Sequence, residues 1–172
     1  MKAITCYANE AMFMSEKDTV TDVKLINSVL DQCRTLRLGL RDGQRVYVVP
    51  VHYGYQEENG HYTLYFHGRP KGRRYELLKA THYAGFEIDD DDIFEPGQDN
   101  MACTYSASYR SVIGEGKVTL VMDPQEKQAA FGPLMQHYTG QTEFKYDPKS
   151  LAYVQVYRLD VTEMSCRIHQ AE

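Results

Sequence analysis

Two turn dipeptides restrict the possible folds of this chain more than any other feature. Asp42-Gly43 and Asn59-Gly60 each separate runs in which apolar and polar residues alternate. Such dipeptides favour the turns that join antiparallel strands, and a period of two is typical of strands with one buried face. The three runs, residues 36–41, 45–55 and 61–67, are therefore predicted to form two successive hairpins.

Helices are predicted on either side of these hairpins. Apolar residues recur at helical spacing over residues 21–33, and Thr21 or Asp22 can cap the first turn. After the third strand, a glycine-containing loop over residues 68–74 leads into a short helix that ends near residue 80. Residues 82–88 then resemble another strand.

The second half of the chain contains the longest strand pattern. It covers residues 103–122 and is interrupted by Gly114 and Gly116, which predict a bend or bulge where a sheet curls. Asp123-Pro124 then begins a helix that reaches about residue 138, with a kink expected at Gly132-Pro133, and a last strand covers residues 152–161. Because the pattern lacks regular β-α-β alternation, we predict a mainly β fold, a small antiparallel barrel with peripheral helices.

The length and charge of the chain exclude several classes of protein. Its 172 residues are predicted to form one domain over residues 21–172, preceded by an extension of residues 1–20. Lys and Arg number 19 against 24 Asp and Glu, so no general positive field attracts nucleic acid. The sequence has neither a signal-peptide pattern nor the run of about 18 apolar residues that a membrane helix needs, which predicts a soluble cytoplasmic protein.

Metal sites are not expected either. Four adjacent carboxylates over residues 89–92 lack the ligand spacing and turning glycine of a calcium loop, so we predict a solvated loop that ends at Glu95-Pro96-Gly97. The cysteines lack the Cys-x-x-Cys spacing of a zinc or dithiol centre and are interpreted as reduced thiols. These cysteines are Cys6, Cys33, Cys103 and Cys166.

A cluster of basic residues is the first candidate for a binding site. Arg69, Lys71, Arg73 and Arg74 lie within six residues of an otherwise acidic chain, at the predicted start of a helix. Cations are unfavourable at the positive end of a helix, so the cluster favours a bound anion such as a phosphate, with Gly72 allowing the backbone to come close. An exposed basic turn is the alternative interpretation, and spacing alone does not decide between the two.

Two histidines are the candidates for acid or base chemistry. The sequence has no Gly-x-Ser-x-Gly elbow and no His-Glu-x-x-His pair. His52 and His67 each lie towards the end of a predicted barrel strand, close to the basic loop. A structural hydrogen-bonding role is the alternative for both.

Several segments together resemble one known family. They are Tyr47-Val48-Val49-Pro50-Val51-His52-Tyr53-Gly54-Tyr55, Leu64-Tyr65-Phe66-His67-Gly68, Gly72-Arg73-Arg74, Tyr109-Arg110-Ser111-Val112-Ile113-Gly114-Glu115-Gly116-Lys117-Val118 and His137-Tyr138-Thr139-Gly140. In this order they are similar to the Nim-type nitroimidazole-resistance proteins, which belong to the pyridoxamine-phosphate-oxidase-like FMN-binding split barrels. The resemblance covers about residues 20–163 and depends on the segments taken together.

The resemblance implies a site for FMN. Arg73 and Arg74 match the basic pair that binds the phosphate in this family, with Lys71 as a helper. His67 matches the histidine near the reactive face of the flavin and is the expected catalytic residue, as a proton donor. The positions that match cofactor-binding residues of the family are Val49, Pro50, Val51, His52, Phe66, His67, Lys71, Arg73, Arg74, Arg110 and Ser111.

The resemblance also implies a homodimer, because two subunits build each flavin site in this family. The C-terminal part departs from the family pattern. Ser165-Cys166-Arg167 stands where relatives usually have Thr-Gly-Lys, so no role is transferred to it, and Met1 to Val20 matches nothing.

Two classes of function follow from this resemblance. The first is an FMN-dependent oxidoreductase that passes electrons from a reductant such as NAD(P)H to a small acceptor such as a nitroaromatic compound. Pyridoxamine-phosphate oxidation is disfavoured, because the additional residues for that substrate's phosphate are not identifiable. The second class is a flavin-binding or haem-binding storage protein without turnover. A structural barrel with a vacant site is a third hypothesis.

Overall fold

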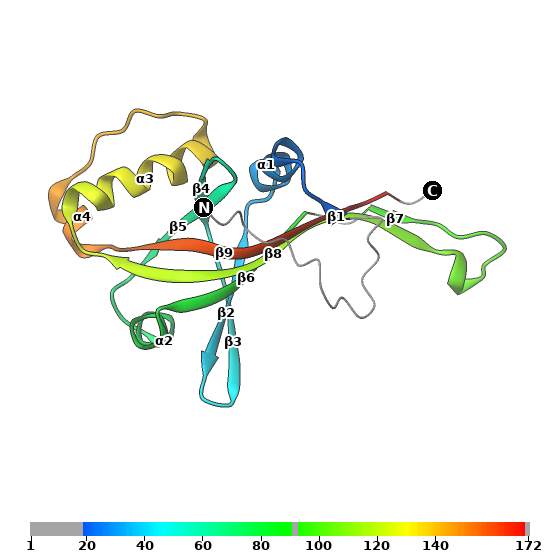
Figure 1. The fold of residues 1–172 in the computed structure, drawn as a ribbon, viewed down its shortest axis with the longest axis horizontal. Coiled ribbons are helices and arrows are strands. Elements are labelled where there is room, and N and C mark those ends of the chain that lie inside the picture. The colour runs from blue at the N-terminus through cyan, green and yellow to red at the C-terminus, as the bar shows by residue number, and fades with distance from the viewer. Residues whose placement is uncertain (1–18, 91–92, 171–172) are drawn as a thin grey trace.

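The computed structural model describes residues 19–90 and 93–170, and in these residues nine strands form one antiparallel sheet with helices around it (Figure 1). The main path through the sheet is β3-β2-β6-β8-β9-β5-β4. The predicted mainly β fold is confirmed. In the same ranges, no helix is both long and apolar enough to cross a lipid bilayer.

The two predicted hairpins are present. They are β2 (Leu36–Asp42) with β3 (Arg45–Val51), and β4 (Tyr53–Glu58) with β5 (His61–Gly68). Asn59 and Gly60 both have the positive φ angles that this dipeptide predicts, whereas the first turn lies one residue later than predicted, at Gly43 and Gln44, because Asp42 still pairs with Arg45.

The predicted single strand over residues 45–55 is wrong, because the chain changes partners at His52. The part before His52, β3, pairs with β2, and the part after it, β4, pairs with β5. These two halves are the opposite ends of the main path through the sheet. The two edges of the sheet are therefore joined covalently at His52 without pairing with each other, which makes the barrel a split one.

The long strands cross the middle of the molecule. They are β6 (Tyr83–Asp89), β8 (Ser106–Val121) and β9 (Gln155–His169). The register of β8 with β9 shifts between Glu115, opposite Glu163, and Gly116, opposite Val161, so Thr162 is the extra residue of a bulge. A Cβ atom at Gly116 would lie 2.3 Å from a backbone oxygen of β9. The bend predicted from the glycines is confirmed.

Three boundaries differ from the prediction. The long strand begins at Ser106 and not at Cys103, because Ala102–Thr104 form a 3-10 turn. The predicted loop up to residue 97 contains a short strand, β7 (Ile93–Glu95), which pairs with the start of β8. The strand β1 (Thr19–Val20) pairs with β9, so the last two residues of the predicted extension belong to the sheet, whereas residues 1–18 lie outside the described residues.

The last strand begins later and is longer than the predicted strand over residues 152–161. Residues 148–153 form a short helix, α4 (Pro148–Tyr153), whose first turn is capped by the Asp147 carboxylate. Consequently β9 begins at Gln155, and it continues to His169 rather than ending near residue 161.

The other helices follow their capping residues. The helix α1 (Val23–Gln32) is capped by Asp22, and α3 (Pro124–Thr139) is capped by Asp123 and continues through Gly132 and Pro133. A third, α2 (Arg73–Thr81), follows the basic loop. In Figure 1, α3 lies along β4, β5 and β9. Its backbone comes so close to β4 that a Cβ atom at Gly54 would lie 2.3 Å from the Leu134 nitrogen.

The core lies inside the curved sheet. Alternate residues of each strand point into it, as the period of two predicts. Fully buried examples are Leu36, Leu38, Leu64, Phe66, Ile88, Val112 and Leu159.

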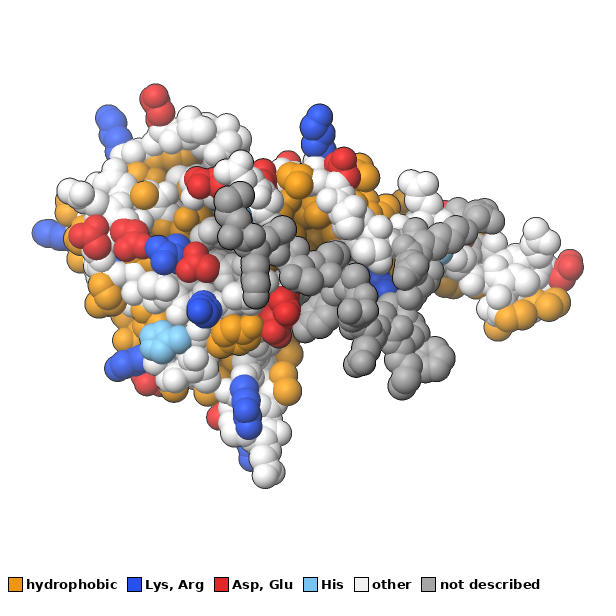
Figure 2. Space-filling view, viewed as in Figure 1, with side chains coloured by type: hydrophobic (Ala, Val, Ile, Leu, Met, Phe, Trp, Pro, Cys, Tyr) orange, Lys and Arg blue, Asp and Glu red, His pale blue; other side chains and the backbone are white. Residues whose placement is uncertain are grey.

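An arm projects from this body. It carries β7 and the beginning of β8, and hydrophobic side chains are exposed along it (Figures 1 and 2). The exposed apolar residues of the arm are Ile93, Phe94, Met101 and Tyr105. Over the rest of the face seen in Figure 2, acidic and basic side chains are interspersed.

Candidate functional site

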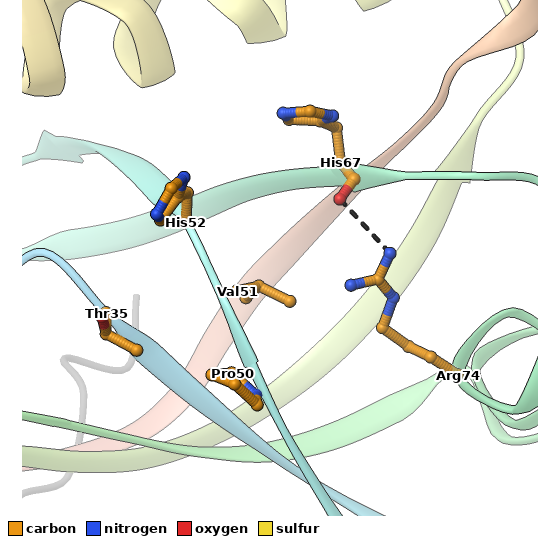
Figure 3. A pocket seen from close by; sticks show the side chains of 6 residues that line it. All are labelled: Thr35, Pro50, Val51, His52, His67 and Arg74. Carbon is orange, nitrogen blue, oxygen red and sulfur yellow. Dashed lines mark hydrogen bonds between the residues drawn. The ribbon is translucent and has the colours of Figure 1, made fainter.

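A cavity of about 350 Å³ lies where β3 passes into β4. Its lining comes from the segment before β2, from the β3–β4 junction, from the end of β5 and from the start of α2 (Figure 3). The lining residues are Thr35, Pro50, Val51, His52, His67 and Arg74. Five of these six residues are among the predicted site residues.

The two histidines of the cavity lie next to each other because of the strand register. Tyr53, the first residue of β4, pairs with Phe66 of β5. His52 precedes Tyr53 and His67 follows Phe66, so the two histidines come together at the end of the hairpin. Tyr53 and Phe66 point into the core, and the two imidazoles therefore project from the opposite face, towards α3 (Figure 3). The ring of His52 lies 4.9 Å from that of Tyr138 on α3.

His67 lies in an environment that favours the neutral imidazole. Its ring packs 5.3 Å from the ring of Phe131. Desolvation lowers the pKa of His67, and the positive charges of Arg74 and His52 lower it further. At neutral pH, an uncharged ring that can donate at one nitrogen and accept at the other therefore faces the cavity.

Arg74 is the guanidinium of the cavity. It occupies the first turn of α2, and its Nη2 atom donates to the His67 carbonyl oxygen at 3.4 Å (Figure 3). The helix can begin here because Gly72, its N-cap, adopts φ +95°, a value that residues with a side chain rarely reach. The backbone conformation thus accounts for a glycine at this position.

Arg73 points elsewhere. Its Nε atom donates to the Asp42 carboxylate at 2.9 Å, and its guanidinium carbon lies 4.5 Å from the centre of the Tyr47 ring. Arg73 therefore faces the β2–β3 turn, and of the two adjacent arginines only Arg74 lines the cavity.

The other predicted site residues lie outside the lining of this cavity. Phe66 is fully buried and stacks on Tyr157, with ring centres 4.9 Å apart. Arg110 forms an ion pair with Asp90 at the far end of β6 and also contacts Gln32. The predicted residues outside the lining are Val49, Phe66, Lys71, Arg73, Arg110 and Ser111.

The end of α3 fixes one wall of the cavity, which the residue patterns did not predict. The Tyr138 hydroxyl donates to the Arg34 carbonyl oxygen, and Arg34 Nη1 donates to the His137 carbonyl oxygen at 2.6 Å. His137 Nε2 lies 2.8 Å from the Cys33 carbonyl oxygen and donates to it. These bonds hold the segment just before Thr35 against α3. They join residues more than a hundred positions apart, and the segment His137-Tyr138-Thr139-Gly140 was marked only by family resemblance.

The two buried cysteines among the described residues, Cys33 and Cys166, are poor candidates for nucleophiles. Cys33, Cys103 and Cys166 are free thiols, whereas Cys6 lies outside the described residues. Burial is the main cause that raises the pKa of Cys33 to about 12 and that of Cys166 to about 11. Both buried thiols therefore stay protonated at neutral pH. Within residues 19–90 and 93–170, no group of three potential metal ligands comes together.

The family of the chain is clear from its sequence and its structure. A model of the pyridoxamine 5'-phosphate oxidase family matches residues 22–168. A solved structure from Bacteroides thetaiotaomicron, provisionally described as a 5-nitroimidazole antibiotic resistance protein, is 27% identical. It has a TM-score of 0.74, and the match covers 87% of this chain and 86% of that chain.

More distant structures share the fold. A flavocytochrome from Azotobacter vinelandii is 17% identical, with a TM-score of 0.73 over 91% of this chain and 72% of that chain. An FAD and haem binding protein from Mycobacterium smegmatis is 16% identical, with a TM-score of 0.76 over 89% and 74%. No curated protein matches the chain. The match to the family model over nearly the whole chain decides the assignment: this chain belongs to the pyridoxamine 5'-phosphate oxidase family, as its resemblance to the Nim-type members predicted.

Proposed function

We propose that this protein is a cytoplasmic, homodimeric FMN-binding oxidoreductase that passes electrons from a reductant such as NAD(P)H to a small acceptor, for example a nitroaromatic compound. The observation that carries the proposal is the placement of Arg74 beside the histidine pair in one cavity of a pyridoxamine 5'-phosphate oxidase family member.

The residues of the cavity fit a phosphate monoester with an aromatic ring system. Among the described residues, Arg74 donates a hydrogen bond to the His67 carbonyl oxygen, and no carboxylate forms an ion pair with it. A guanidinium beside a cavity without an acidic partner is complementary to a phosphate. The solved relatives described as flavin-binding or as a nitroimidazole resistance protein support a flavin as the ligand.

Each lining residue would have a separate task. Arg74 would hold the phosphate, and Pro50, Val51 and the His52 ring would contact the isoalloxazine system. FMN supplies the redox chemistry when it is bound. The neutral imidazole of His67 can relay a proton, because its unprotonated nitrogen can accept a proton from solvent while its other nitrogen gives one to a group that is being reduced.

A second copy of the chain has a suitable surface on the outer face of β2, β3, β6 and β8. Val48 and Ile113 are 58% and 52% exposed on this face. Between these strands Gly39 and Gly85 pair directly, so the middle of the face carries no side chains and is flat. Charged side chains share this face, because Arg37 pairs with Glu87 and Glu115 lies opposite Gly85, so the flat glycine row together with Val48 and Ile113 would form the contact with the partner. Ser111, which shares this face with Ile113 and lies outside the cavity of its own subunit, would reach the partner's site from this dimer, whereas Arg110 points to the other side of β8, where it contacts Gln32.

The colour and reactivity of the purified protein test the proposal. We expect a yellow protein that releases FMN on denaturation, and whose flavin band is bleached anaerobically by reduced nicotinamide and restored by a nitro compound. FAD or haem in place of FMN would overturn the choice of cofactor. A bound flavin that no reductant bleaches would favour a carrier without turnover, and a colourless protein whose melting temperature FMN does not raise would contradict flavin binding altogether.

A further inference from the structure

Gly68, the last residue of β5, has no conformational reason to be a glycine. Its φ is not among the positive values found at Gly43, Gly60, Gly72 and Gly140, so residues with a side chain could adopt the same backbone. The obstacle is Arg74. A Cβ atom at Gly68 would lie 1.6 Å from Arg74 Nη2 and 2.9 Å from its Cζ, and no atom outside the Arg74 guanidinium comes closer than 3.6 Å.

The other side of the guanidinium rests on Tyr157. The centre of the Tyr157 ring lies 5.9 Å from the Arg74 Cζ atom, a cation–π arrangement. Tyr157 is fully buried and stacked on Phe66, and its hydroxyl has no hydrogen-bond partner among the described residues. The ring is therefore held in place by packing, and Arg74 lies near both the ring and the hydroxyl, since desolvation raises the pKa of Tyr157 while the Arg74 charge opposes that rise.

These contacts hold a long side chain in one orientation. A free arginine side chain would lose much rotamer entropy on binding a ligand, and a guanidinium already fixed at the cavity loses less. The bare backbone of Gly68, the carbonyl of His67 and the ring of Tyr157 together form what we call the Arg74 seat. A side chain at position 68 would fill the place that the guanidinium now occupies.

We infer that Gly68 and Tyr157 are positioning residues that aim Arg74 into the cavity and thereby set the preference of the site for flavins that carry a phosphate. The inference rests on the proposed function, because it concerns the same site. The inference extends the proposed function, because it assigns the discrimination between a phosphorylated and an unphosphorylated flavin to Gly68 and Tyr157, which do not line the cavity.

Binding of FMN and of riboflavin tests the inference, since riboflavin has the same ring system without the phosphate. The variants are G68A, R74A and the double variant G68A/R74A, and G132A is the matched control because a Cβ atom there meets no other atom within 4 Å. Kd values are measured by flavin fluorescence after thermal melting has verified folding.

We expect the unaltered protein to bind FMN more tightly than riboflavin. G68A should weaken FMN binding about tenfold or more while changing riboflavin binding less than about twofold, because one lost charged hydrogen bond corresponds to about a factor of ten. In the R74A background, G68A should have no further effect on either Kd, and G132A should keep the full preference.

A second pair of variants covers the case in which G68A does not fold. Y157L removes the ring beside Arg74 and should reduce the preference for FMN, whereas Y157F retains the ring, loses only the hydroxyl near Arg74 and should reduce the preference less. The seat would be ruled out if G68A or Y157L kept the full preference, or if either weakened both flavins equally. A protein that binds neither FMN nor riboflavin without any substitution would instead contradict the proposed function itself.

Discussion

Two adjacent arginines of α2 occupy very different electrostatic environments. Arg73 is neutralised by Asp42 and covers Tyr47, whereas Arg74 lines the cavity without a carboxylate partner among the described residues. We therefore expect R74A to weaken FMN binding by about 1.5–3 kcal/mol, the usual range for a hydrogen bond to a charged group. R73A should weaken FMN binding by less than about 1 kcal/mol, since Arg73 is paired with Asp42 and does not line the cavity. Isothermal titration calorimetry of both variants checks this, and an equal or larger loss in R73A would contradict the assignment.

The histidines should make stability depend on pH in a defined direction. Desolvation by burial is the main cause that lowers the pKa of both His67 and His137. As the pH falls through the ordinary value of about 6.5, the unfolded chain takes up protons that the folded protein does not, so the free energy of unfolding decreases. The histidine contribution is fully present above that value and is lost progressively below it.

Urea unfolding at about pH 7.5 and pH 5.5 measures this loss, because most carboxylates stay ionised over that range. The substitution H137Q keeps a donor for the Cys33 carbonyl but cannot titrate, so the difference between the two pH values should shrink in this variant. An exposed histidine serves as the control, and H61Q should leave the difference unchanged. The same pH dependence in H137Q as in the unaltered protein would argue against a lowered pKa for His137.

At the scale of single residues, the sequence was informative where neighbours in the chain are also neighbours in space. The histidine pair and Arg74 could be predicted, because a hairpin end and the following loop must lie together. The pairing of Arg73 with Asp42 could not, since it depends on α2 coming to rest beside the β2–β3 turn. Thr35 lacked any local pattern, because its position is set by bonds between residues 33–34 and the distant end of α3.

The backbone of α3 comes very close to the backbone of β4 at Gly54. The missing side chain of Gly54 allows it, since a Cβ atom would lie 2.3–2.4 Å from backbone atoms of Pro133 and Leu134. A helix backbone cannot move aside as a flexible side chain can. We expect G54A to lower the free energy of unfolding by about 1–3 kcal/mol, as is usual for overpacking.

Thermal and urea unfolding check this expectation, with G132A as the control on the same helix. Position 132 has open space for a methyl group, and alanine is favoured over glycine within a helix by up to about 1 kcal/mol, so G132A should be neutral or stabilising. If G54A were as stable as G132A, the close approach of α3 to β4 would be wrong.

Elements were predicted well where their ends carry local chemical signals. Asp22 and Asp123 cap α1 and α3 as expected. Asn59 and Gly60, which have positive φ angles, join the two strands of the second hairpin as expected. The break at His52 left no such mark, because residues on both sides of it alternate in the same way and only the choice of partner strand differs. Asp147-Pro148 did carry the signal of a helix start, but α4 is too short to show helical periodicity.

The closure of the barrel is a property of the whole molecule. The absence of β-α-β alternation predicted an antiparallel barrel. It did not predict the order of the strands, which depends on which edges of the sheet come together when β8 and β9 bend at their bulge. The same arrangement determines the outer surface. It places Val48 beside Gly39 and Glu115 beside Gly85, with Ile113 on the same face opposite Glu87, although these residues are far apart in the sequence.

The proposed dimer can be tested on that face. Charged side chains would have to lose their hydration when the face is buried, so the double substitution V48E/I113E should convert the dimer into a monomer in sedimentation experiments. M122E changes a residue that is 72% exposed beyond the end of β8 and should leave the dimer intact. Because both subunits would contribute to each site in the proposed dimer, the monomeric variant should also bind FMN more weakly although Arg74 and both histidines are unchanged. A dimer that survives V48E/I113E would place the interface on another surface, and a monomer that binds FMN with full affinity would show that one subunit is sufficient for the site.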